Sequence, residues 1–165
     1  MTSTTSTQGR ALALIALLTV TAGAVAAPQA HADNSRLNNS VFANIYTAQK
    51  QNGCVAEPRI DRRLVDAARA HALDVLNNRD LDGDLGSDGS TTEDRSRAAG
   101  FTGKVAETVA INSAIAISGI DILGQWYGDP VAWGIMRDCS HTAIGVWSEN
   151  SLDRSVVVAV YGTPA

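Results

Sequence analysis

The chain has 165 residues, and its 13 lysines and arginines stand against 17 aspartates and glutamates, which gives a formal net charge of −4 at pH 7. This length suits a single domain with one hydrophobic core. An acidic chain without a basic stripe excludes nucleic acid as a partner and disfavours an anionic membrane.

Residues 1–32 have the features of a secretory signal peptide. Arg10 is the only charged residue before the apolar run Ala11–Ala27, and the small-x-small pattern Ala30-His31-Ala32 follows this run. We therefore predict export by the Sec route and a secreted or cell-envelope domain over residues 33–165. This domain is expected to be a monomer without stable membrane insertion, and a retained N-terminal anchor is the alternative.

Two cysteines, Cys54 and Cys139, are the only ones in the chain. An even pair in an exported protein most often forms a disulfide. Closing a loop of about 85 residues would stabilise the fold by roughly 4–5 kcal/mol on the chain-entropy model. The alternatives are a zinc pair or a reactive thiol, since His141 lies two residues from Cys139, but no CxxC-like spacing supports them. We predict a Cys54–Cys139 disulfide.

Two amphipathic helices are predicted in the first half of the domain. Apolar residues recur at helical spacing over residues 37–48, and Asn52-Gly53 supplies a stop. A second helix over about residues 61–77 has Asp61 in place to be its N-cap. Its alanine-rich stripe should let it approach a sheet closely. That stripe consists of Leu64, Ala68, Ala72 and Val75.

Residues 80–95 hold six carboxylates among sixteen residues, which invites comparison with a calcium loop. An EF-hand loop needs a glycine at position 6 and a glutamate at position 12. A loop that starts at Asp80 has Leu85 and Thr91 at these places, and one that starts at Asp82 has its glycine one place early. The stretch is therefore predicted to be a turn between helices.

The pattern after the acidic stretch changes from helix to strand. Ser90-Thr91-Thr92-Glu93 predicts the capping box of a short helix that ends at Gly100, and a fourth helix is predicted over Ser113–Tyr127. Residues 143–147 and 155–161 are β-rich runs that predict a hairpin, with its second strand covered on both faces. Helices followed by an antiparallel pair indicate an α+β layered domain. The fourth helix is expected to bury Ile120, Leu123 and Trp126.

Six short segments occur in order along nearly the whole domain. They are Asn44–Gly53, Ala70–Asp74, Gly86-Ser87-Asp88-Gly89-Ser90 with Arg95, Ala106–Ala110, Trp126–Pro130 and Ile144-Gly145-Val146. In this order they resemble the motifs of the CAP superfamily, the SCP/PR-1-like cysteine-rich secretory proteins, in its small exported bacterial branch. The resemblance implies an α-β-α sandwich with about four helices around a small antiparallel sheet.

In many members of this family two histidines and two acids converge in a cleft and can bind a divalent ion. By position, Asp84 and Ala132 stand where the two histidines would lie, and Glu107 and Asp129 stand at the acids. Zinc prefers nitrogen and sulfur donors and should bind such a set poorly. The resemblance thus implies a degenerate metal-site cleft, no confident catalytic residue and no expected cofactor. Asp84, Glu107 and Asp129 remain weak candidates for calcium or magnesium.

The two histidines outside the signal segment are expected to have structural places. His71 lies on the alanine-rich face of the second helix, where a hydrogen-bonded core histidine is the default, and His141 falls at an ordinary loop position.

The leading hypothesis, implied by the resemblance, is a secreted and non-enzymatic protein that binds a lipid or protein partner outside the cell. A lipid would need an apolar cleft that opens between helices, and the aliphatic segment Ile111–Leu123 with Trp126 and Trp133 could line it or simply pack the core. The alternative is a hydrolase or metal-dependent enzyme that uses Asp84, Glu107 and Asp129.

Overall fold

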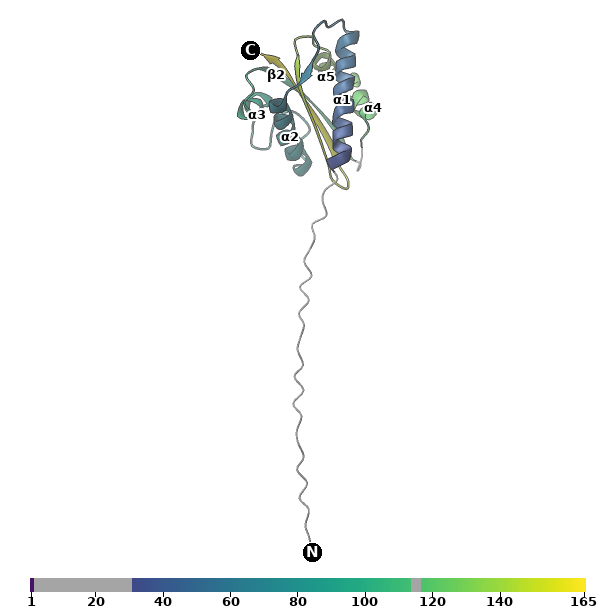
Figure 1. Ribbon diagram of the computed structural model, residues 1–165, viewed down its shortest axis with the longest axis vertical. Helices are drawn as coiled ribbons and strands as arrows, with labels where there is room; N and C mark the ends of the chain where they lie inside the picture. The colour runs from purple at the N-terminus through teal and green to yellow at the C-terminus, as the bar shows by residue number, and fades with distance from the viewer. Residues whose placement is uncertain (2–30, 114–116) are drawn as a thin grey trace.

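A mixed four-stranded sheet lies between two layers of helices in the computed structural model, which describes Met1 and residues 31–113 and 117–165 (Figure 1). The predicted signal segment therefore lies almost entirely outside the described residues. The α-β-α sandwich that the resemblance implied is confirmed.

One face of the sheet is covered by three helices, and the other face by two. The first layer holds α1 (His31–Gln51), α4 (Gly119–Gly128) and α5 (Pro130–Met136), and the second holds α2 (Arg62–Asn77) and α3 (Thr92–Ala98). Asp61 caps α2 as predicted, since its carboxylate accepts a hydrogen bond from the Arg63 backbone N–H at 2.9 Å. The described residues thus form five helices where about four were expected.

The sheet has the strand order β1-β3-β4-β2. Its strands are β1 (Arg59–Ile60), β2 (Gly103–Asn112), β3 (Ala143–Asn150) and β4 (Ser155–Pro164). The hairpin of β3 and β4 confirms the prediction, and β2 pairs antiparallel with β4. The expected antiparallel sheet is mixed instead, because the short β1 pairs parallel with β3.

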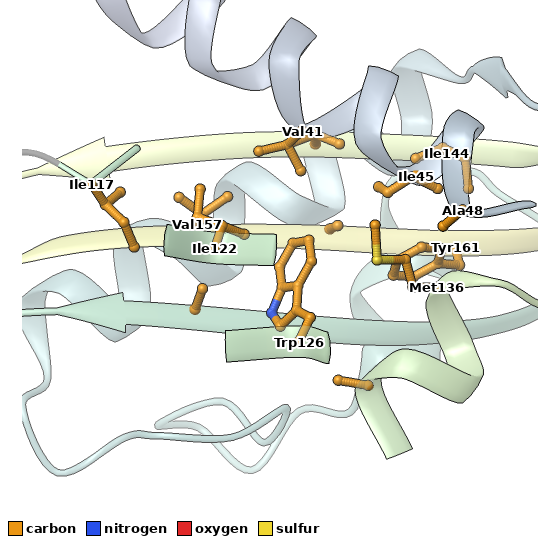
Figure 2. Close-up of a cluster of buried hydrophobic side chains, with 14 residues drawn as sticks. Val41, Ile45, Ala48, Ile117, Ile122, Trp126, Met136, Ile144, Val157 and Tyr161 are labelled. Carbon is orange, nitrogen blue, oxygen red and sulfur yellow. The ribbon is translucent and has the colours of Figure 1, made fainter. Parts of the chain in front are cut away.

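The central strand β4 is buried on both faces, as its unbroken apolar run predicted. Val157, Ala159 and Tyr161 face the α1 layer, where they pack with the side chains drawn in Figure 2, and the alternate valines 156, 158 and 160 face α2. The Tyr161 hydroxyl lies 3.0 Å from the Thr108 hydroxyl, which satisfies both buried groups.

Helix α2 approaches the sheet so closely that one position of β3 must be glycine. A Cβ atom on Gly145 would lie 2.1 Å from the carbonyl carbon of Leu64 and 2.3 Å from the backbone nitrogen of Val65. The buried alanines 67, 68 and 72 of α2 permit this approach. The prediction drawn from the alanine-rich stripe is thus confirmed.

The predicted helix over Ser113–Tyr127 is partly wrong. The strand β2 extends to Asn112, and α4 begins only at Gly119, where Ser118 and Asp121 form a capping box. Residues 114–116 lie outside the described residues. Trp126 is buried as expected, but Ile120 is 81% exposed, and Ile122 takes the inward position.

Two further boundaries differ from the sequence prediction. The N-cap of α3 is Thr91, one residue later than Ser90, and its capping-box partner is Asp94. Helix α5 was not predicted at all. It begins because Asp129 caps it and Pro130 occupies its first position, where a missing N–H costs nothing.

The predicted disulfide is present between Cys54 and Cys139, which are 85 residues apart. It joins the loop after α1 to the loop between α5 and β3. No helix of residues 31–113 and 117–165 is long and apolar enough to cross a lipid bilayer.

Candidate functional site

A pocket of about 440 Å³ opens where the edge strand β2, the loop between α2 and α3, and the helices α4 and α5 meet. The four positions that the family resemblance singled out, Asp84, Glu107, Asp129 and Ala132, all line it. Trp126 forms part of the wall, and its indole N–H donates to the carbonyl of Val109 at 3.1 Å. The sequence resemblance therefore located one real cavity.

Glu107 is the buried acid of this pocket, and protein groups already contact it. Arg95 Nη2 lies 3.0 Å from Glu107 Oε1, and His71 Nε2 lies 3.4 Å from the same oxygen. The side chains of Glu107 and His71 are fully buried, and that of Arg95 is 9% exposed. The other oxygen, Oε2, has no hydrogen-bond partner among the described residues.

His71 is the buried core histidine that its place on α2 predicted. Its Nε2 lies 2.9 Å from the carbonyl oxygen of Gly83, and since a carbonyl only accepts, Nε2 carries the hydrogen. Burial lowers the pKa of His71 and so favours the neutral ring. An Nε2 that bonds a carbonyl in this way is not free to bind a metal.

Arg95 ties the loop between α2 and α3 to β2. Besides Glu107, its guanidinium donates to the carbonyl of Ser90 at 2.8 Å and to the carbonyl of Asp84 at 2.7 Å. The buried guanidinium therefore donates to Glu107 and at the same time orders the acidic loop.

The backbone of the acidic loop is held by donors from other parts of the protein. Its backbone oxygens at Leu81, Gly83, Asp84 and Ser90 accept hydrogen bonds from Arg154, His71 and Arg95. Calcium sites in proteins use such carbonyls together with carboxylates. The loop's carbonyls are thus occupied by protein donors, and its glycine-rich segment forms a turn, as predicted.

Asp82, Asp84 and Asp129 are the other acids of the pocket, and the last two, which the family positions indicated, have different roles. Asp129 Oδ1 accepts from the backbone N–H groups of Val131 at 2.8 Å and Ala132 at 3.3 Å, which makes it the N-cap of α5. Asp84 has an exposed side chain, and its backbone carbonyl is held by Arg95. Within residues 31–113 and 117–165, no group of three or more histidines, cysteines, aspartates or glutamates is arranged to hold a metal ion.

His141 lies outside the cluster of Glu107, Arg95 and His71. Its ring packs against Tyr161 at a centroid distance of 5.7 Å, and Nδ1 lies 3.4 Å from the Thr163 hydroxyl. Its carbonyl accepts from the buried Gln49 amide at 3.0 Å. These contacts agree with the ordinary loop position predicted for it.

Burial dominates the ionisation of Glu107. Loss of hydration raises its pKa to about 8, although Arg95 opposes this rise. The folded protein therefore keeps a proton that the unfolded chain releases above about pH 4.5. The stability contributed by this proton is fully present below pH 4.5 and is lost as the pH rises toward 8.

We expect the variant Glu107→Gln to remove this pH dependence. Between pH 5 and 8, the unfolding free energy of the wild type should fall relative to that of the variant by on the order of 2–3 kcal/mol. His71 acts in the opposite sense on both proteins, because its lowered pKa gives stability that is lost as the pH falls through its range. Urea unfolding at several pH values measures the difference, and the exposed control Glu57→Gln should leave the slope unchanged.

A second hollow of about 180 Å³ lies between α1 and the α4–α5 pair. Its apolar wall includes Leu123, Tyr127 and Trp133, and the two aromatic rings lie 4.8 Å apart. Polar side chains of α1 complete the lining, among them Asn44, Thr47 and Gln51. This hollow between helices thus combines an apolar wall with polar side chains.

The comparisons with known proteins agree with this architecture. The fold is similar to that of an outer surface protein from Borrelia burgdorferi, with a TM-score of 0.67 and 16% identity over 82% of this chain and 96% of that one. It is also similar to an extracellular protein containing an SCP domain from Bacillus anthracis, with a TM-score of 0.70 and 13% identity over 86% of this chain. A cysteine-rich secretory protein from Staphylococcus aureus matches with a TM-score of 0.58 and 13% identity over 80% of this chain.

The chain thus has the fold of the SCP domain, which is the fold of the CAP superfamily. It spans 45% of the Bacillus protein and 40% of the Staphylococcus protein. No protein-family model and no curated protein matches the sequence.

Sequence reasoning missed the cluster of Glu107, Arg95 and His71. Each residue stands in a segment that resembles a family motif, but nothing in the sequence shows that α2, α3 and β2 bring them together. The one available signal was the need for a cation near the acids of the pocket, and Arg95 is that cation.

Proposed function

We propose that the protein is a secreted SCP-type domain that binds a lipid and has no catalytic activity. The observation that carries the proposal is the hollow between α1 and the α4–α5 pair, which combines an apolar wall with a polar rim. At about 180 Å³ the hollow would hold a short segment of an acyl chain, with the rest of the lipid outside it and the head group near polar side chains.

The contacts of the acids in the pocket lined by Glu107 and Asp129 support a role without catalysis. Its buried acid is held by Arg95 and His71, and Asp129 is used as a helix cap. The positions Asp84 and Ala132 supply no imidazole, so the pocket is a degenerate form of the family's metal cleft.

Export is part of the same proposal. Residues 1–32 would act as a cleaved signal peptide, leaving a domain over residues 33–165 outside the cell. Two of the fold neighbours are named as an extracellular and an outer surface protein, and the disulfide agrees with an oxidising compartment.

A titration with cis-parinaric acid, a fluorescent fatty acid, tests lipid binding. The variant Thr47→Trp places a large side chain in the hollow and should weaken binding by about tenfold or more, whereas Ala43→Trp, exposed on the same helix outside the lining, should leave it unchanged. Absence of binding by the wild type, or equal effects of the two variants, would contradict the proposal.

A metal-dependent or hydrolytic enzyme is the second candidate, and one observation favours it. Glu107 Oε2 has no partner among the described residues, and its raised pKa suits a proton donor near neutral pH. Release of nitrophenol from p-nitrophenyl butyrate that depends on Glu107, and survives in the control His141→Gln, would favour this candidate.

A further inference from the structure

The strand β2 is an edge strand, because it stands last in the sheet order β1-β3-β4-β2. In a β-strand, the backbone N–H and C=O groups of alternate residues point to opposite edges. The carbonyls of Val109 and Ile111 accept hydrogen bonds from side chains of α4, so the odd-numbered residues of β2 direct their backbone groups away from β4. Glu107 belongs to this set, and its backbone therefore faces the open edge.

The backbone of Glu107 is accessible at this edge. Its side chain is fully buried, yet the whole residue is 8% exposed, so the accessible part is main chain. Among the described residues, neither its N–H nor its C=O has a hydrogen-bond partner. An edge strand with unpaired N–H and C=O groups is a template for pairing with another extended chain.

The pocket of about 440 Å³ at this edge is acidic. Asp82 and Asp84 lie on the loop of the α2–α3 layer, whereas Asp129 begins α5 in the opposite layer. All three aspartates are exposed. No lysine or arginine is among the described residues that line the pocket. A partner that enters it should therefore carry positive charge.

We propose that β2 receives an extended, basic peptide of a partner protein as an added strand. The peptide backbone would bond to the N–H and C=O of Glu107. Successive side chains of a strand point to opposite faces, so two adjacent basic residues would each meet a carboxylate, one at Asp84 and the other at Asp129. Val131 and Ile135 also line the pocket and would contact the aliphatic stems of these basic side chains.

A partner protein fits this edge better than a second copy of the same chain. Pairing of two β2 edges would bring the same aspartates of both copies together, which is unfavourable. The inference goes beyond lipid binding and does not rest on it, because no described residue lines both the pocket and the hollow beside α1.

Fluorescence anisotropy with a labelled heptapeptide tests the docking. The probe has two adjacent arginines among valines and threonines, and its binding to the oxidised protein should weaken severalfold when NaCl rises from about 50 to about 500 mM. The double variant Asp82→Asn with Asp84→Asn should weaken binding by about fivefold. The matched control Asp80→Asn, exposed on the same loop but outside the lining, should leave it unchanged.

Two further peptides distinguish strand addition from simple attraction of charge. Each has alternate backbone amides methylated, so that one lacks the N–H groups that face β2 and the other lacks those that face away. Strand addition predicts that only one of the two loses binding. Equal binding by both would overturn the proposal and leave a site for basic side chains alone.

The proposal also fails if the unmethylated probe does not bind, or if Asp80→Asn weakens binding as much as the double variant does. The lipid hollow is tested separately. Thr47→Trp should bind the peptide as the wild type does, and the double aspartate variant should still bind cis-parinaric acid.

Discussion

Replacing Arg95 with methionine should destabilise the protein by about 3 kcal/mol. Removing one partner of a buried ion pair leaves an uncompensated buried group, which in this case is Glu107, and also frees the carbonyls of Asp84 and Ser90. At pH 5 Glu107 already carries a proton and needs no counter-ion, so the loss should be larger at pH 8 than at pH 5. Urea unfolding at both pH values measures it.

The control is Arg97→Met, two residues further along α3. Arg97 has a side chain that is 70% exposed and pairs with Asp94 on the surface, so its loss should change stability by less than about 0.5 kcal/mol. Adding Glu107→Gln to Arg95→Met should recover part of the stability, because the neutral amide needs no counter-ion. Equal losses for Arg95→Met and Arg97→Met would contradict the role assigned to the buried cation.

Removal of the disulfide should lower the unfolding free energy by an amount comparable to that of Arg95→Met. The bond closes a loop of 85 residues, and the double variant Cys54→Ser with Cys139→Ser should lose about 4 kcal/mol of unfolding free energy. Thermal or urea unfolding compared with the oxidised wild type gives the value.

Mass spectrometry under non-reducing conditions supplies the control for this prediction. The oxidised protein should lack the two thiol hydrogens, and reduction alone should reproduce the instability of the double variant. Two free thiols in the native secreted protein would contradict the bond.

Local patterns explain which parts of the fold could be predicted. The stripe of α2, the cap at Asp61 and the apolar run of β4 each follow from residues near one another in the sequence. The strand β2 was missed because its central residues, including Glu107 and Thr108, are polar, and their burial depends on partners supplied by other elements.

The candidate site, too, was predictable only in part: its positions could be recognised in the sequence, whereas the contacts between them could not. Family positions indicated Asp84, Glu107, Asp129 and Ala132, and all four line one pocket. The donors that contact Glu107 depend on tertiary packing, because His71 lies on α2, Arg95 on α3 and Glu107 on β2. The hollow beside α4 was likewise not visible, since its lining comes from α1, α4 and α5, and α5 was not predicted.

Glu107 is contacted by Arg95 and His71, and Asp129 serves as a helix cap, so we expect the pocket that they line to bind no metal ion. Thermal unfolding of metal-free protein with micromolar zinc, calcium or magnesium tests it most directly, because any ion bound only by the folded state must raise the midpoint. We expect the midpoint to be unchanged with all three ions. A rise of several degrees that disappears in Glu107→Gln would contradict the account.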